Sequence, residues 1–140
     1  GRTVLLLGAG GAAKAVGHAL AAAGAGRIIV CARRSERAAA LAAQLPGCGE
    51  GIVLAQDAIQ QAAAACDLLV NATPLGMTGQ EEFADFRFLE NCHGWVYDLV
   101  YQPRETALLA AAQDRGLPVI GGLALLHAQA ELAFELFVGE

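Results

Sequence analysis

Three small residues near the start of the chain stand at a spacing that suits phosphate binding. Gly8, Gly10 and Ala13 form the pattern G-x-G-x-x-A. Between a strand and a helix, the first glycine allows a tight turn, the second lets a pyrophosphate approach the backbone, and the alanine lets the helix pack closely on the strand. The free amides and the dipole at the helix start then attract the anion. The pattern predicts a dinucleotide-binding loop, with an ordinary glycine turn as the alternative.

A cluster of arginines is the second group of residues for which the sequence predicts ligand binding. Arg33, Arg34 and Arg37 follow a predicted strand at residues 27–31, where an NAD enzyme places Asp or Glu to bind the ribose 2′-hydroxyl. No acid stands directly at this strand end. Guanidinium groups form charged, forked hydrogen bonds with a phosphate, so the segment predicts NADP as the cofactor. The alternative is a solvated arginine surface, although cations at a helix start are unfavourable unless an anion compensates.

The elements that must position these residues alternate between strand and helix. Apolar runs predict strands at residues 3–7, 27–31, 51–54, 67–71, 95–100 and 118–120. Helical spacing predicts helices at residues 11–24, 35–45, 57–65, 104–115 and 123–137, with Ser35 and Asp57 as N-caps and Thr106 as a cap or packing residue. Residues 75–92 are expected to form a loop with at most a short helical turn. This alternation predicts an α/β, doubly wound parallel sheet, Rossmann-like, in the order 3-2-1-4-5-6.

Composition limits the classes of function. The 140 residues, 56% of them hydrophobic and 16% charged, predict a single domain. A net charge of -5 argues against a nucleic-acid partner, and no run reaches the roughly 18 apolar residues of a membrane span. No C-x-x-C pair or histidine–carboxylate spacing suggests a metal site, and reduced thiols in the cytoplasm are expected. The chain enters its first strand directly after Gly1-Arg2, so we expect a domain cut from a longer protein.

Several separated segments together resemble one family. They are residues 8–12, the arginine stretch ending in Arg37-Ala38, Asn71-Ala72-Thr73-Pro74-Leu75-Gly76-Met77, Asp98-Leu99-Val100-Tyr101, and residues 122–129. They are similar to the C-terminal NADP-binding domain of shikimate dehydrogenase. The resemblance implies reversible reduction of 3-dehydroshikimate to shikimate by hydride transfer from NADPH, in aromatic amino acid biosynthesis.

The resemblance also implies roles for individual residues. The diphosphate would be held by Gly8, Ala9, Gly10, Gly11 and Ala12, and the adenine and 2′-phosphate by Ala32, Arg33 and Arg34, followed by Arg37. Asn71 and Thr73 would lie under the cofactor, and the backbone at Leu99 and Gly122 would meet the nicotinamide carboxamide. Tyr101 and Gln129 would reach the substrate. Ala32, Arg34, Ala124 and Leu125 depart from the usual family residues, which affects the geometry of the phosphate clamp more than its charge.

The family's catalytic Lys and Asp lie in an N-terminal substrate domain to which nothing in this sequence corresponds. Lys14 is the only lysine, and it belongs to the helix after the glycine loop. No catalytic residue is therefore expected in this chain, which should bind NADPH without turnover. The small-molecule substrate would be shared with the missing domain.

Other interpretations stay open from the residues alone. Asn71 could cap the turn after its strand, Tyr101 could be an amphipathic core residue, and Gln129 could be a surface residue. The chain could also be the nucleotide domain of a quinate-using relative or of a glutamyl-tRNA reductase, or a stand-alone, non-catalytic NADP-binding module. Arg33 and Arg34 argue against an NAD-using relative, and the segments around Tyr101 and Gln129 argue against the tRNA-linked enzyme.

Overall fold

The sheet is built around β1, Thr3–Leu7, in the computed structural model, which describes residues 2–45, 47–53 and 56–121. The four apolar side chains that follow Thr3 are fully buried, as expected for a strand covered on both faces. β1 pairs in parallel with β2, Arg27–Ala32, on one side and with β4, Leu68–Asn71, on the other. Three further parallel strands complete the sheet: β3, Gly49–Val53, β5, Trp95–Asp98, and β6, Val119–Ile120.

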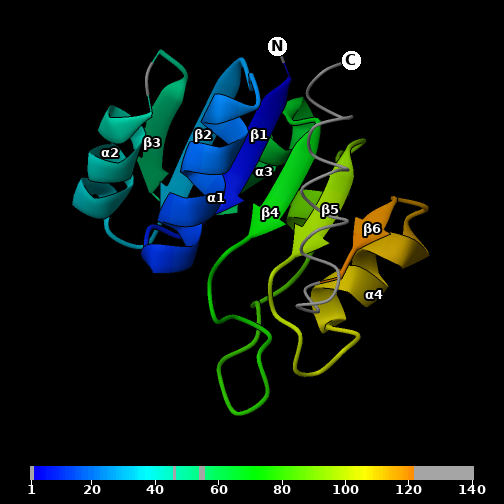
Figure 1. The fold of residues 1–140 in the computed structure, drawn as a ribbon. Helices are drawn as coiled ribbons and strands as arrows, with labels where there is room; N and C mark the ends of the chain where they lie inside the picture. Colours follow the sequence, from blue (N-terminus) through cyan, green and yellow to red (C-terminus); the bar gives the residue numbers. More distant parts are fainter. Residues whose placement is uncertain (1, 46, 54–55, 122–140) are drawn as a thin grey trace.

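The strand order is β3-β2-β1-β4-β5-β6, which confirms the predicted topology. The chain first winds outward from β1 to β3 and then crosses back to β4, beside β1 (Figure 1). After β1 the chain therefore continues toward one edge of the sheet, and after its neighbour β4 it continues toward the other edge. In open α/β sheets, ligands bind at such a switch point, outside the carboxyl ends of the strands.

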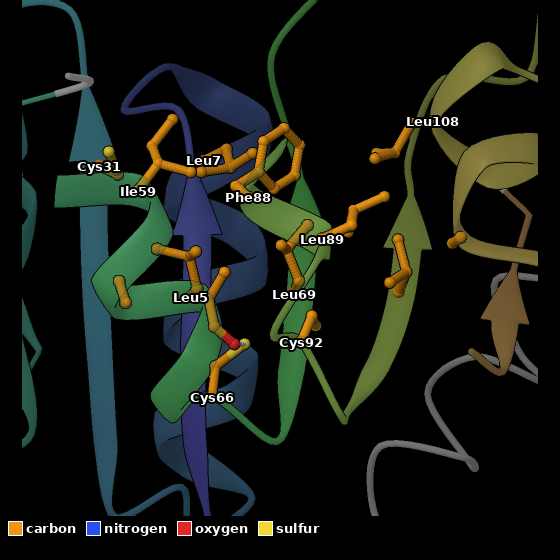
Figure 2. Close-up of a cluster of buried hydrophobic side chains, with 14 of the residues drawn as sticks. Leu5, Leu7, Cys31, Ile59, Cys66, Leu69, Phe88, Leu89, Cys92 and Leu108 are labelled. Atoms are coloured by element: carbon orange, nitrogen blue, oxygen red, sulfur yellow. Dashed lines mark hydrogen bonds between the residues drawn. The ribbon is translucent and has the colours of Figure 1, made fainter. Parts of the chain in front are cut away.

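Helices cover both faces of the sheet (Figure 1). Helices α1, Gly11–Ala22, and α2, Ser35–Gln44, pack on one face, where they share a buried cluster with Val4 and Leu6. The other face is covered by α3, Gln56–Ala65, by a 3-10 turn η1, Arg87–Leu89, and by α4, Ala107–Asp114. Figure 2 shows this second cluster, in which Leu5 and Leu7 of β1 lie with side chains from α3 and η1. Alternate residues of β1 thus hold the two layers together.

Several predicted element ends were wrong by a few residues. Arg34, with extended backbone angles, is the N-cap of α2, so Ser35 is already helical. Asp57 likewise lies inside α3, which begins at Gln56. Helix α4 begins later than expected because the Thr106 hydroxyl accepts a hydrogen bond from the Leu109 N–H at 3.2 Å and caps it there. The helix predicted at residues 123–137 lies outside the described residues.

The long segment after β4 forms a loop with one helical turn, η1, as predicted. Its phenylalanines pack together, with the Phe83 ring centroid 5.7 Å from those of both Phe86 and Phe88. Phe88 is buried in the cluster beneath α3 (Figure 2). The aromatic residues of this irregular segment therefore anchor it to the sheet.

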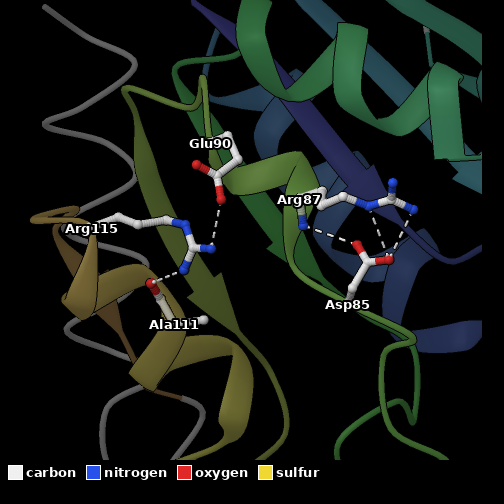
Figure 3. Close-up of polar contacts among 5 residues, drawn as sticks. All are labelled: Asp85, Arg87, Glu90, Ala111 and Arg115. Carbon is white, nitrogen blue, oxygen red and sulfur yellow. Dashed lines mark hydrogen bonds and ion pairs between the residues drawn. The ribbon is translucent and has the colours of Figure 1, made fainter.

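Ion pairs also hold the second half of this loop. Figure 3 shows Arg115 donating hydrogen bonds to the Glu90 carboxylate at 2.9 Å and to the Ala111 carbonyl at 3.0 Å. Asp85 accepts hydrogen bonds from the backbone N–H and the Nε of Arg87, at 3.0 and 3.2 Å. The first pair joins the end of η1 to α4, and the second stiffens the approach to η1.

We predict that Gly94→Ala destabilises the fold while Gly121→Ala does not. A Cβ at Gly94 would collide with the Asp67 backbone, whereas one at Gly121 would have only the Leu109 side chain nearby, at 3.9 Å. Urea unfolding should show a loss of roughly 2–4 kcal/mol for Gly94→Ala and a change within about 0.5 kcal/mol for Gly121→Ala. Equal losses in the two variants would contradict this close approach of backbones.

Candidate dinucleotide-binding site

A cleft of about 500 Å³ lies at the carboxyl ends of β1, β2 and β4. Its walls come from the turn after β1, the tip of β2 with the start of α2, and the loop after β4. The lining residues are Gly8, Ala9, Gly10, Ala32, Arg33, Arg34, Arg37, Ala72, Thr73, Pro74, Leu75, Gln80 and Glu81. The glycine loop and the arginine segment, predicted separately from the sequence, therefore face one cavity at the topological switch point.

Gly8 is required by its backbone and by its surroundings. Its φ is +116°, a conformation that residues with a side chain rarely adopt, and an added Cβ would stand 3.0 Å from the Ala72 carbonyl oxygen. Its N–H donates to the Cys31 carbonyl at 2.8 Å, while the Ala72 N–H donates to the Leu7 carbonyl at 2.8 Å. The tight turn predicted at Gly8 therefore brings three strand ends together.

The start of α1 offers unobstructed amides to the cleft. Gly10 is the N-cap, with φ -86° and ψ -164°, and no side chain caps the first turn. A Cβ added at Gly10 or Gly11 would meet no heavy atom within 4 Å, so the backbone there borders open space. Ala13 is fully buried against the sheet, which allows α1 to lie close behind the loop. This concave run of amides fits a diphosphate group.

Arginines line the end of the cleft where the sequence predicted that the adenosine would bind. Ala32 is buried at the end of β2 and contributes to the wall, and Arg33, Arg34 and Arg37 follow it around the opening. Arg33 Nη2 lies 3.1 Å from an oxygen of Glu81, a residue to which the sequence assigned no role. This segment presents several positive charges and one opposing carboxylate to the same space.

A second hollow of about 330 Å³ adjoins the first. Its lining residues are Ala12, Ala72, Thr73, Pro74, Met77, Leu99, Val100, Tyr101 and Gln102. Thr73 borders both cavities, so one elongated ligand could occupy both. The side chain of Tyr101 is not in the core, because the residue is 51% exposed, and the core interpretation of this residue was wrong. Gly122 and Gln129, also predicted here, lie outside the described residues.

Asn71 stands behind the site and borders neither cavity. It is fully buried, and its Nδ2 donates to the Asp98 carboxylate and to the Leu75 carbonyl, both at 3.1 Å. Its Oδ1 accepts from the Thr73 N–H at 3.1 Å and from the Thr73 hydroxyl at 2.6 Å. With both amide atoms engaged in the protein, Asn71 fixes the turn that carries Thr73 into the cleft.

Asp98 is a buried carboxylate to which the sequence alone assigned no role. Its Oδ1 accepts from Asn71 and from the Val100 N–H at 3.0 Å, and its Oδ2 accepts from the Thr106 hydroxyl at 2.7 Å. Burial raises the pKa of Asp98, while these donors oppose the change. The carboxylate therefore joins the loop after β4, the segment of Leu99 and Tyr101, and the start of α4. The only signal in the sequence was the segment Asp98-Leu99-Val100-Tyr101.

Metal binding has no support in the part of the chain that the structure describes. There, no group of three or more His, Cys, Asp or Glu residues could hold an ion. All four cysteines are free, and burial raises the pKa of the Cys31 thiol to about 12. Among the described helices, none has the length and apolar character needed to cross a bilayer.

Comparison with known proteins decides the family. A model of the family described as shikimate / quinate 5-dehydrogenase matches residues 1–79. The chain belongs to this family. The resemblance read from the sequence is thereby confirmed.

Relatives of the shikimate / quinate 5-dehydrogenase family match nearly all of this chain. Shikimate dehydrogenase (NADP(+)) of Methylobacterium radiotolerans is 47% identical over 139 residues, which cover 99% of this chain and 49% of that protein. The enzyme of the same name from Moorella thermoacetica is 43% identical over 148 residues, with the same coverage. The chain thus spans about half the length of the curated relatives it matches.

Solved structures of the family share the fold. Quinate dehydrogenase from Corynebacterium glutamicum in complex with NAD has a TM-score of 0.74 and 34% identity, covering 99% of this chain and 50% of that one. Shikimate 5-dehydrogenase from Thermus thermophilus, in complex with NADP(H) and shikimate, has a TM-score of 0.69 and 35% identity, covering 98% of this chain and 49% of that one. The Rossmann-like fold class is confirmed.

We predict that titration of Asp98 contributes to the pH dependence of stability. Because burial raises its pKa in the folded protein, the folded state holds the proton more tightly than the unfolded state. The stabilising contribution of Asp98 is complete below the ordinary pKa of Asp, and it is lost as the pH rises through the pKa of Asp98 in the folded protein. Relative to Asp98→Asn, the wild type should lose free energy of unfolding as the pH rises from about 4 toward neutrality.

Urea unfolding across that pH range measures the effect. Glu105→Gln, which removes an exposed carboxylate from the same segment, serves as the control. Parallel stability curves for the wild type and Asp98→Asn would refute the contribution of Asp98.

Proposed function

We propose that the chain is the NADP-binding domain of a shikimate dehydrogenase, which reversibly reduces 3-dehydroshikimate to shikimate by hydride transfer from NADPH. The observation that carries the proposal is the single cleft in which uncapped helix amides and an arginine-lined end face each other. Amides of this kind suit a diphosphate, and guanidinium groups suit a further phosphate on the adenosine ribose. Family membership and the relatives named above support the same reaction.

Each end of the cleft then has its own task. The backbone from Gly8 to Ala12 would hold the diphosphate, and the segment from Ala32 to Arg37 would hold the adenosine and its 2′-phosphate. Thr73 would support the middle of the cofactor, where the two cavities meet. Leu99 would offer its backbone to the nicotinamide, and Tyr101 would reach the substrate from the exposed wall of the second cavity.

The bound cofactor supplies the hydride, but reduction of a ketone also needs a proton donor near the carbonyl oxygen. The described part of the second cavity contains no lysine or carboxylate in its lining. Asp98 is fully buried behind it, and Lys14 is exposed on α1. We therefore assign the proton-transfer groups, and most of the substrate contacts, to an N-terminal substrate domain of the whole protein. The free cysteines fit the reducing conditions of the cytoplasm, where we place it.

A quinate-using enzyme is the second candidate function. The family description includes quinate, and the quinate dehydrogenase of Corynebacterium glutamicum is similar to this chain over nearly its whole length. That structure contains NAD, whereas Arg33 and Arg34 in this cleft favour a phosphorylated ribose. Cofactor preference of the chain itself therefore tests for an NAD-using relative, and activity of the whole protein on shikimate and on quinate distinguishes the two substrates.

Calorimetric titration should show that the chain binds NADPH more tightly than NADH, by about tenfold to a hundredfold, because charged hydrogen bonds contribute roughly 1.5–3 kcal/mol each. Arg33→Ala combined with Arg34→Ala should remove most of this difference by weakening NADPH binding. The control, Arg87→Ala combined with Arg104→Ala, removes the same charge at positions outside the cleft lining. Equal affinity of the wild type for both cofactors would overturn the NADP assignment, and binding of neither would overturn the site.

The chain alone should not oxidise shikimate in the presence of NADP, although it binds the cofactor. Absorbance of NADPH at its reduced-nicotinamide band would measure turnover. A chain joined to the substrate domain of a family member is the positive control. Oxidation of shikimate or quinate by the isolated chain would show that it carries its own proton-transfer group and would contradict the two-domain assignment.

A further inference from the structure

An ion pair crosses the dinucleotide cleft, and its acidic member, Glu81, has no role in the proposed binding of cofactor. Arg33 Nη2 and Glu81 Oε2 are 3.1 Å apart, and both residues line the 500 Å³ cavity. Arg33 comes from the tip of β2, whereas Glu81 comes from the loop after β4, which hangs below the carboxyl ends of the strands (Figure 1). The pair is therefore a link between two walls of the cleft.

The backbone holds Glu81 in this place. We call residues 74–81 the strap. Within it, the Gly76 N–H donates to the Glu81 carbonyl at 2.8 Å, which folds the strap back toward the cleft. The Thr78 N–H donates to the Gln102 carbonyl at 2.7 Å and ties the strap to the segment after β5. These bonds hold the Glu81 main chain beside the cleft, where its carboxylate can reach Arg33.

Glu81 engages one arginine of the set. Across residues 2–45, 47–53 and 56–121, no ion pair joins Arg34 or Arg37 to a carboxylate. The side chains of Arg33 and Glu81 are 70% and 80% exposed, so water screens their attraction and the pair is weak. An incoming phosphate group with two negative charges can therefore displace the carboxylate, but it must compete with it.

We propose that Glu81 is a specificity-determining residue that competes with the 2′-phosphate of NADP for Arg33. A ligand with a plain 2′-hydroxyl can bind while the ion pair persists. A 2′-phosphate must either separate Arg33 from Glu81 or bind beside a carboxylate that repels it. Glu81 thus lowers the preference of the cleft for NADPH over NADH. The inference rests on the proposed function, because it requires the adenosine ribose to lie at the arginine end.

A role for Glu81 in supporting NADPH binding would change the affinity for NADPH in the opposite direction. If Glu81 only held the Arg33 side chain in a productive orientation, its removal would weaken NADPH binding. Competition predicts that removal strengthens NADPH binding. The direction of the change therefore separates the two roles.

The experiment compares Glu81→Gln with Glu82→Gln in calorimetric titrations with NADPH and with NADH. Glu82 is the neighbouring exposed residue, so both variants remove one negative charge from the same segment. In low salt, Glu81→Gln should tighten NADPH binding by about two- to fivefold and leave NADH binding nearly unchanged. Glu82→Gln should change the two affinities by a common small factor. The selectivity gained in Glu81→Gln should decline at high ionic strength.

A double-mutant cycle with Arg33→Gln tests the pairing itself. Without the Arg33 guanidinium, Glu81→Gln should affect NADPH binding no more than Glu82→Gln does. Equal changes in selectivity from Glu81→Gln and Glu82→Gln, or weaker NADPH binding in Glu81→Gln, would overturn the inference. Wild-type preference for NADPH without a specific effect of Glu81 defeats this inference alone. A wild type that binds neither cofactor defeats the proposed function and the inference together, whereas equal affinity of the wild type for both cofactors overturns the NADP assignment and leaves the inference to be decided by Glu81→Gln.

Discussion

The close approach of two backbones, at Gly8 and Ala72, is the constraint on which the rest of the site depends. It places the turn after β1 against the turn after β4, at the point where the chain winds in opposite directions. A side chain at Gly8 would be strained at a φ of +116°, and its Cβ, 3.0 Å from the Ala72 carbonyl oxygen, would press the two turns apart by a few tenths of an ångström. The start of α1 on one side and Thr73 on the other border the same cavity because these turns lie this close together.

A network of buried polar side chains also organises the site. Asn71 and Asp98 end neighbouring strands, β4 and β5, and are opposite each other in the sheet register. Their hydrogen bond lets one carboxylate orient the turn with Thr73, the Val100 amide and, through Thr106, the start of α4. Because a buried polar group without a partner is costly, this network favours one arrangement of the loops between the two cavities. Thr73 and the segment 99–101 are thus positioned by residues that do not themselves line the cavities.

Local patterns in the sequence predicted the parts of this molecule that depend on interactions between residues close together in the chain. Buried apolar runs indicated the strands, and the glycine pattern indicated the turn and the uncapped helix start, because each depends on residues a few positions apart. Element ends were less predictable: Ser35 was expected to cap α2, but the extended residue before the helix proved to be Arg34. The contacts of Asp98 and Glu81 could not be predicted, since their partners Asn71 and Arg33 are 27 and 48 residues away. Such pairings exist only once the sheet has brought distant loops to one edge.

The two ends of the cleft follow different physical rules. At the glycine loop, the donors are backbone amides fixed by α1, so little conformational entropy is lost when an anion binds there, and the interaction does not depend on the ribose. At the arginine end, the donors are exposed side chains that a ligand must order and that solvent screens. The first end therefore suits general affinity for a dinucleotide, and the second suits discrimination between dinucleotides. A carboxylate on a loop can adjust that discrimination without disturbing the backbone on which the fold and the affinity depend.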